Sequence, residues 1–99
     1  MEVRINPVGF SVSSQLEDFI QKKLLKLDKY NDAILDIDVT LKLEKDENLE
    51  NKVVEVNVGI KGQDVFGKKN AKKFEDAVDE LYDVIKRQLV KIKEKEREK

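Results

Sequence analysis

The chain has 99 residues, enough for one domain with a single hydrophobic core. It contains no Cys and no His, which excludes a disulfide, a zinc site and a Ser-His-Asp or Cys-His catalytic group. Charged residues make up 41% of the chain while the net charge is only −1, so its partners have to be inferred from where the charges lie.

The N-terminal part of the sequence predicts a short strand followed by a helix. Val3 and Ile5 alternate with polar residues in 2–6, and Pro7 ends this strand. A helix is predicted to begin at Ser14-Gln15-Leu16-Glu17, which has the spacing of a capping box, and to end near Tyr30. The apolar residues at helical spacing, which we expect to form its buried face, are Leu16, Phe19, Ile20, Leu24 and Leu27.

Three strands are predicted in the middle of the chain. Apolar and polar residues alternate in 37–44 and again in 54–60, as in an antiparallel sheet that helices cover on one face. A polar connection at 46–51 separates these two strands. A turn at 61–63 leads to a weaker strand at 64–69.

A second long helix begins near Ala71 or Phe74, so the predicted order is β-α-β-β-β-α. We expect an α+β fold with both helices on the one apolar face of a four-stranded sheet, because nothing else in the chain can cover it. The order resembles the topology of double-stranded RNA-binding domains. Residues 1–93 should form a single domain, and 94–99 a charged tail that frays. The expected buried face of the second helix consists of Phe74, Val78, Leu81, Ile85, Leu89 and Ile92.

The first helix carries a row of lysines. Lys22, Lys26 and Lys29 are spaced i, i+4, i+7 and therefore share one exposed face, with Lys23 near the edge of the apolar stripe. These cations would suit a phosphate-binding surface. They would equally suit the negative end of the helix dipole, and the pattern leaves both explanations open.

The second helix divides into an acidic half and a basic half. Its predicted polar side is acidic over 75–83 and carries Lys86, Arg87, Lys91 and Lys93 thereafter. The helix dipole again favours this polarity. If the two helices pack antiparallel or side by side, however, their basic halves could form one positive surface that follows RNA phosphates.

A lysine cluster precedes the second helix. Lys68, Lys69, Lys72 and Lys73 lie where a helix N-terminus favours anions over cations. Either these residues bind a phosphate, or they belong to a strand and a turn from which their long stems reach water. We treat them as candidate additional phosphate contacts.

The sequence offers no group for catalysis, so we expect neither an enzyme nor a cofactor, metal or small-molecule substrate. Asp36 and Asp38 lie on one strand face, but a solvated face is the better interpretation of that charge run. The G-x-x-G at 59–62 falls at a strand end, unlike the loop of KH modules, and a small enzyme of acylphosphatase-like shape would lack an anchored catalytic group. No apolar run could span a bilayer and no signal-peptide pattern is present, so we expect a cytoplasmic protein without membrane contact.

Several short segments, in the right order and at the right lengths, resemble one family over essentially the whole chain. They are Lys23-x-x-Lys26-Leu27-x-x-Tyr30, Val39-Thr40-Leu41-Lys42-Leu43-Glu44-Lys45 and Asp79-x-Leu81-x-Asp83-x-Ile85-x-Arg87-Gln88-Leu89-x-Lys91. None of them is diagnostic alone. Together they resemble the short ribosome hibernation promoting factors, which are close to ribosome-associated inhibitor A and also called sigma factor modulation proteins.

The resemblance implies a non-enzymatic protein that binds the small ribosomal subunit in the channel for messenger and transfer RNA and blocks translation in starved or stationary cells. By position, it implies that Lys23, Lys26, Arg87 and Lys91 meet ribosomal RNA phosphates. Helical geometry adds Lys22, Lys29, Lys86 and Lys93 to this set.

Two departures from the family pattern affect the contacts rather than the fold: Glu75 stands where an aromatic residue is common, and the cluster at 68–73 is unusually rich in lysine. Long members carry a further C-terminal domain that pairs ribosomes. We therefore expect this chain to be monomeric off the ribosome and not to pair ribosomes unaided.

Two alternatives remain open. Lys68-Lys69-Asn70-Ala71-Lys72 matches the K-K-x-A-K run of a general double-stranded RNA-binding domain, although 45–51 lacks that domain's G-P-x-H-like loop and the chain has an extra leading strand. The second alternative is a protein-binding regulator that uses the acidic strand at 36–44. Its binding would be insensitive to replacement of the helix lysines.

Overall fold

The computed structural model describes residues 1–45 and 50–97. Its elements, in chain order, are β1 (Glu2–Pro7), α1 (Ser14–Leu25), the 3-10 helix η1 (Lys26–Lys29), β2 (Ile34–Leu43), β3 (Lys52–Ile60), β4 (Gln63–Ala71) and α2 (Phe74–Arg97). This order confirms the predicted β-α-β-β-β-α fold, a four-stranded sheet with two helices.

The strands lie in the order β1-β2-β3-β4. Neighbours β2, β3 and β4 are antiparallel, as the alternating pattern predicted. The β1–β2 pair is parallel, with Val3 beside Ile37 and Ile5 beside Val39, so the sheet is mixed; the alternating pattern had predicted no direction for this edge strand. This pair is parallel because α1 carries the chain back along the sheet, so that β2 starts at the same end as β1.

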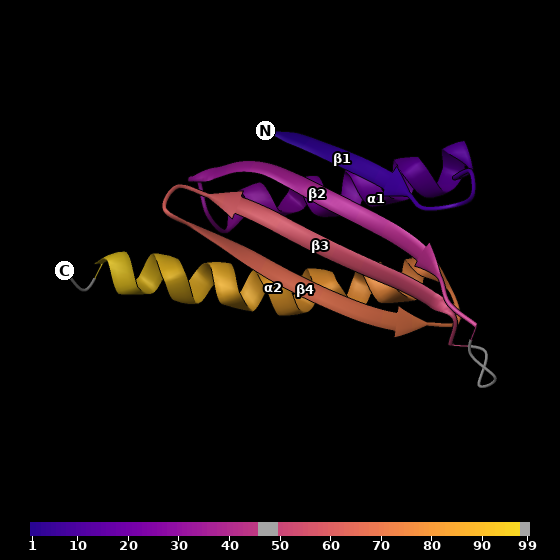
Figure 1. Ribbon diagram of the computed structural model, residues 1–99. Coiled ribbons are helices and arrows are strands. Elements are labelled where there is room, and N and C mark those ends of the chain that lie inside the picture. The colour runs from indigo at the N-terminus through magenta and orange to yellow at the C-terminus, as the bar shows by residue number, and fades with distance from the viewer. Residues whose placement is uncertain (46–49, 98–99) are drawn as a thin grey trace.

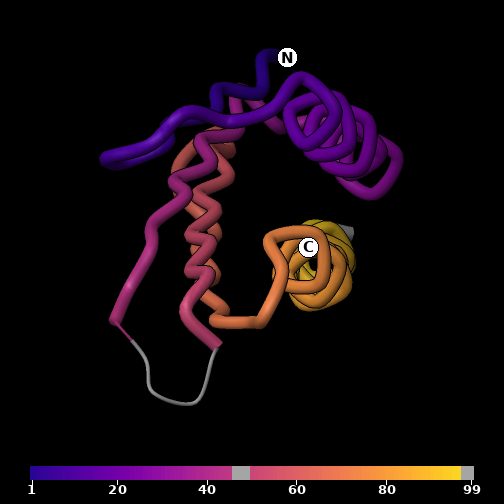
Figure 2. The backbone as a smooth tube through the Cα atoms, turned by 90° about the vertical axis from the view of Figure 1, so that its right-hand side faces the viewer, coloured from indigo at the N-terminus to yellow at the C-terminus, as the bar shows by residue number. Residues whose placement is uncertain are grey.

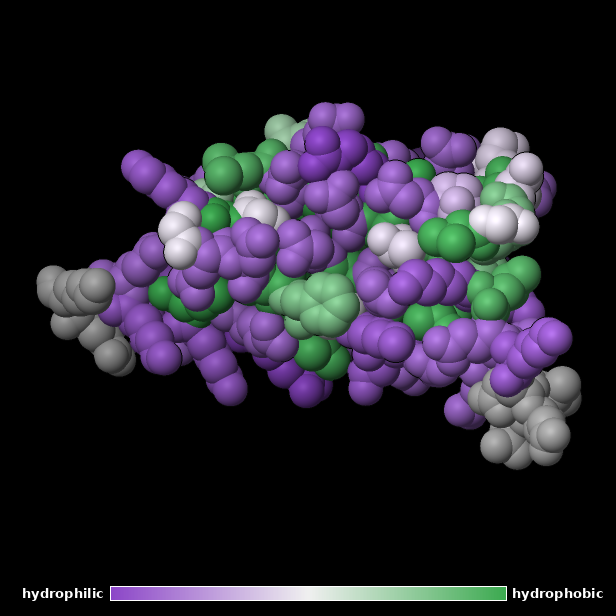
Figure 3. Space-filling view, in the orientation of Figure 1, coloured by the Kyte–Doolittle hydropathy of each residue, from purple (hydrophilic) through white to green (hydrophobic). Residues whose placement is uncertain are grey.

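Both helices lie on one face of the sheet (Figure 2). Figure 1 looks onto the opposite, open face. That face is mostly hydrophilic with scattered apolar side chains (Figure 3), as expected for a sheet with one solvated side. The sheet therefore separates the surface formed by the helices from the surface formed by the strands.

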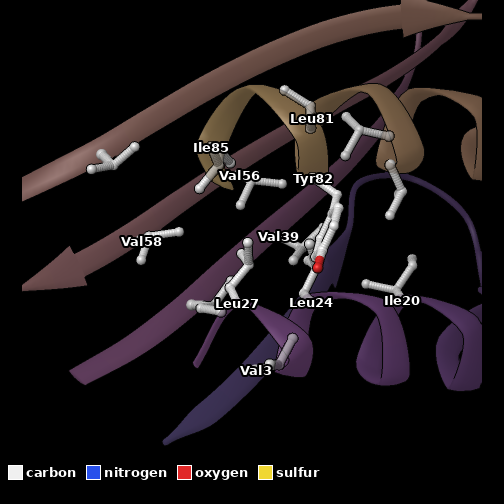
Figure 4. Packing of buried hydrophobic residues seen from close by; sticks show 14 of the residues in the cluster. Val3, Ile20, Leu24, Leu27, Val39, Val56, Val58, Leu81, Tyr82 and Ile85 are labelled. Atoms are coloured by element: carbon white, nitrogen blue, oxygen red, sulfur yellow. The ribbon is translucent and has the colours of Figure 1, made fainter. Parts of the chain in front are cut away.

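The core fills the space between the helices and the sheet (Figure 4). The predicted apolar stripes supply it, although Leu16, Phe19 and Ile92 are only partly buried. The fully buried side chains of the two helices include Ile20, Leu24, Leu27, Leu81, Ile85 and Leu89. Helix α2 packs so closely on β4 that a Cβ at Gly67 would lie 2.8 Å from Leu81 Cδ2.

The ends of the helices differ from the predicted ones. Ser13, not Ser14, is the N-cap of α1, and its Oγ accepts a hydrogen bond from the Leu16 amide at 3.1 Å. Ala71 belongs to β4, so α2 begins at Phe74. Helix α2 then continues to Arg97, through most of the segment predicted to fray.

Two parts of the sequence-based predictions lie outside the described residues. They are most of the polar connection between the second and third strands, at 46–49, and the last two residues of the tail, 98–99. The side chain of residue 97 is likewise not described.

Candidate nucleic-acid interface

The two helices run in the same direction along the sheet (Figure 1). In Figure 2 both are seen nearly end-on and side by side. Their C-terminal halves, which carry the lysines, therefore lie at the same end of the molecule. This arrangement fulfils the condition under which the sequence predicted a common positive surface.

The cations at this end have different exposures. We call the set the basic helix face; it consists of Lys22, Lys23, Lys26, Lys29, Lys86, Arg87, Lys91 and Lys93. All are exposed except Lys23, Lys86 and Lys93, which are half-buried. Within residues 1–45 and 50–96, only Lys23 of this set forms an ion pair. The other cations therefore keep their charge available for a partner.

Two surface depressions lie along the C-terminal half of α2, and one of them lies between η1 and α2. One, of about 230 Å³, is lined by Lys29 and Tyr30 on one side and by Val90, Lys93 and Glu94 on the other. The second, of about 390 Å³, runs along α2 and is lined by Lys86, Arg87, Val90, Lys91 and Glu94. Val90 and Glu94 line both depressions, so Lys29 of η1 and the cations of α2 border two adjoining depressions.

An aromatic pair joins the two helices, and Tyr30 of this pair also lines the depression between η1 and α2. The rings of Tyr30 and Tyr82 meet edge to face with centroids 6.4 Å apart, and the Tyr82 hydroxyl donates a hydrogen bond of 3.4 Å to the Tyr30 hydroxyl. Figure 4 shows Tyr82 extending from α2 toward Leu24 of α1. Tyr82 was not part of the predicted buried face, yet it is buried.

Two lysines lie over these rings. Lys86 Nζ is 5.4 Å from the Tyr30 centroid and 6.0 Å from that of Tyr82. Lys23 Nζ lies 4.7 Å from the Tyr82 centroid and 3.3 Å from the Asp79 carboxylate. A partly exposed cation–π contact contributes about 0.5–1 kcal/mol and an exposed ion pair ~0.2–1 kcal/mol, so these contacts adjust the packing of the helices rather than create it.

The environment of the aromatic pair shifts the pKa values of the two tyrosine hydroxyls in opposite directions. Burial, followed by the hydrogen bond to Tyr30, raises the pKa of Tyr82 to about 12. The pKa of Tyr30 is lowered, mainly because its oxygen accepts the hydrogen bond from Tyr82 and also because Lys86 and Lys29 are near. Tyr82 therefore remains the donor in this pair when Tyr30 ionises.

The second lysine cluster is separate from the basic helix face. Lys68 and Lys69 lie in β4, and Lys72 and Lys73 in the connection to α2, at the opposite end of that helix. All four are exposed. Lys72 borders a depression of about 410 Å³ whose other charged lining residues are acidic: Glu50, Asp76, Asp79 and Glu80. A phosphate would meet repulsion here, so the structure gives this cluster less support than the basic helix face.

Arg4 of β1 forms ion pairs with two aspartates of the acidic strand, which is β2. Arg4 Nε lies 2.7 Å from Asp38 Oδ1, and Arg4 Nη2 lies 3.0 Å from Asp36 Oδ2. The hydrogen bond to Asp38 raises the pKa of Arg4 above its ordinary value. Asp36 and Asp38 are thus bridged by a guanidinium and do not form a pair suited to acid–base catalysis.

Two further observations concern the described part of the chain. It contains no group of three or more acidic side chains that could hold a metal ion. None of its helices combines the length and the apolar composition that crossing a bilayer requires.

Comparisons with known proteins agree over the whole chain. The sequence profile of the family described as sigma 54 modulation protein / S30EA ribosomal protein matches residues 3–97. The ribosome hibernation promoting factor of Azotobacter vinelandii is 30% identical over 99 residues, which are 100% of this chain and 89% of that protein. The factor of the same name from Escherichia coli K12 is 31% identical over 100 residues, covering 96% of each chain.

Solved structures show the same fold. A ribosomal subunit interface protein from Coxiella burnetii superposes with a TM-score of 0.83 at 25% identity, over 94% of this chain and 98% of that one. The N-terminal domain of Protein Y from Thermus thermophilus gives 0.80 at 22% identity, over 93% and 99%. Profile, relatives and fold agree, and this chain belongs to the sigma 54 modulation protein / S30EA ribosomal protein family.

Proposed function

We propose that this protein is a non-enzymatic ribosome hibernation factor that binds ribosomal RNA of the small subunit through the basic helix face, in the channel for messenger and transfer RNA. Bound there, it would inhibit translation by occupying the site. The family and the names of its relatives support a ribosome-associated role in the cytoplasm.

One observation carries the proposal beyond the family. Helices α1 and α2 run in the same direction, so two lysine-rich helix ends lie at one end of the molecule and border two adjoining depressions. The helix dipole explains a cation at each helix end by itself. It does not explain why both ends are placed together, with seven of the eight cations unpaired within the described part of the chain.

The protein-binding alternative has less support. Its acidic strand is partly occupied by Arg4, so the two aspartates that made it attractive already have a partner. The double-stranded RNA alternative relied on a K-K-x-A-K run at a helix start. In the structure, residues 68–71 of that run lie in β4 instead.

Co-sedimentation with purified ribosomal subunits tests the proposal. We expect binding to the small subunit that weakens steeply as salt rises, because neutralising phosphates releases counterions. Long double-stranded RNA should not displace the protein. Efficient displacement by the duplex would favour a general RNA-binding domain, and binding that does not depend on salt would favour a protein contact.

A further inference from the structure

The contacts of Lys23 set it apart from the other cations of the basic helix face. Its ammonium group lies 3.3 Å from Asp79 and 4.7 Å from the ring of Tyr82, and both residues belong to α2. The side chain is 29% exposed. Lys23 therefore extends from α1 across to α2, whereas a lysine that binds a phosphate must direct its ammonium group to the partner.

Lys86 makes the reciprocal contact. It extends from α2 to the ring of Tyr30, which follows η1, and Tyr30 accepts a hydrogen bond from Tyr82. Each helix thus places one lysine on an aromatic ring that the other helical segment supplies. We call this set the interhelical clamp; it consists of Lys23, Tyr30, Asp79, Tyr82 and Lys86.

We propose that the interhelical clamp is a positioning device for RNA binding, and that Lys23 acts by holding α2 against α1 rather than by contacting a phosphate. The proposal rests on the proposed function. The phosphates of a folded RNA have a fixed arrangement. A binding surface that is built from two helices therefore gains affinity when the helices already hold the right relative position before the RNA binds, because less ordering is then needed on binding. The clamp joins the two helices, and its Tyr30 lines the same depression as Lys29 and Lys93.

Asp79 distinguishes the two roles because they predict opposite effects. If Lys23 contacts a phosphate, Asp79 competes with the RNA for its ammonium group, and Asp79→Asn should tighten binding. If Lys23 is a positioning residue, Asp79→Asn removes one of its two anchors and should weaken binding. The matched control is Asp76→Asn, which changes the net charge equally at an exposed position in the same helix.

The test compares the affinity of both variants for purified small subunits at one salt concentration. We expect Asp79→Asn to bind roughly two- to fivefold more weakly than Asp76→Asn, the range that corresponds to the loss of one partly exposed ion pair. Lys23→Arg, which keeps the charge and can still reach both partners, should bind like the unaltered protein. Equal or tighter binding by Asp79→Asn would overturn the proposal.

A second readout does not depend on RNA. Proton NMR of the free protein should show cross-relaxation between the rings of Tyr30 and Tyr82, the only two tyrosines in the chain. In Asp79→Asn this signal should weaken while the thermal unfolding temperature stays close to that of the unaltered protein. An unchanged signal would contradict the clamp. Failure of the unaltered protein to bind small subunits would instead overturn the proposed function, even with the ring contacts intact.

Discussion

Replacing Leu27 by Ala tests how the short helix η1 is held in place. Leu27 is fully buried, although its neighbours Lys26, Asp28 and Lys29 are all exposed. It is the one buried anchor of η1, a four-residue helix that carries two cations of the basic helix face. The side chain packs with those of α1 and the sheet (Figure 4).

The expected cost follows from the burial of this side chain. Removing a fully buried leucine loses its transfer free energy and leaves a cavity, which together cost about 2–5 kcal/mol. A domain of this length has a total stability of roughly 5–15 kcal/mol. Leu27→Ala should therefore remove a large share of the stability.

Urea unfolding followed by far-ultraviolet circular dichroism measures this cost. Leu25→Ala is the matched control, because Leu25 lies two residues earlier and is 43% exposed. We expect Leu25→Ala to lower the free energy of unfolding by less than about 1 kcal/mol, as for most surface positions. Equal costs for the two variants, or a cost below about 1 kcal/mol for Leu27→Ala, would refute the packing described here.

Three further predictions concern α2, the α1 cap and the aromatic pair. Gly67→Ala should lower the free energy of unfolding by about 1–3 kcal/mol in urea unfolding, because its Cβ would overlap the buried Leu81; an unchanged stability would contradict the close packing of α2 on β4. In the same assay, Ser13→Ala should lower the free energy of unfolding by about 1 kcal/mol and Ser14→Ala by distinctly less, because Ser13 is the N-cap. The reverse order would support the capping box predicted at Ser14. Absorbance titration should show Tyr30 ionising first and Tyr82 near pH 12, and Tyr30→Phe should abolish the earlier step. Because folding raises the pKa of Tyr82, the stability it contributes is complete below pH 10 and is lost as the pH rises through about 12.

The fold was predictable because its signals are local. The alternation in 37–44 and 54–60 matches strands whose odd and even residues face opposite sides. The predicted stripe of α2 matches its buried residues, except that it omits Ala77 and Tyr82 and includes the partly buried Ile92. The N-cap was misplaced by one residue because two adjacent serines can each accept a hydrogen bond from a helix N-terminus. The choice between them depends on where the incoming chain turns.

The site was only partly predictable because its contacts are distant in sequence. Tyr82 and Tyr30 are 52 residues apart, and nothing in either segment alone indicates that their hydroxyls meet. The sequence placed Lys23 at the edge of the apolar stripe, which is where it lies, but its partner Asp79 follows from the packing of α2. The bridge from Arg4 to the acidic strand likewise requires the parallel β1–β2 register, in which Arg4 faces Asp38.

The most direct test of the central claim is the salt dependence of small-subunit binding for two charge reversals. Lys26→Glu changes the basic helix face, and Lys45→Glu makes the same change in net charge just beyond β2, at the opposite end of the molecule. We predict that Lys26→Glu weakens binding and makes the fall of the logarithm of the association constant with log salt less steep, by about 1 in the slope, as expected for one lost phosphate contact. Lys45→Glu should leave the slope unchanged. Equal effects of the two variants would contradict the assignment of RNA binding to the basic helix face.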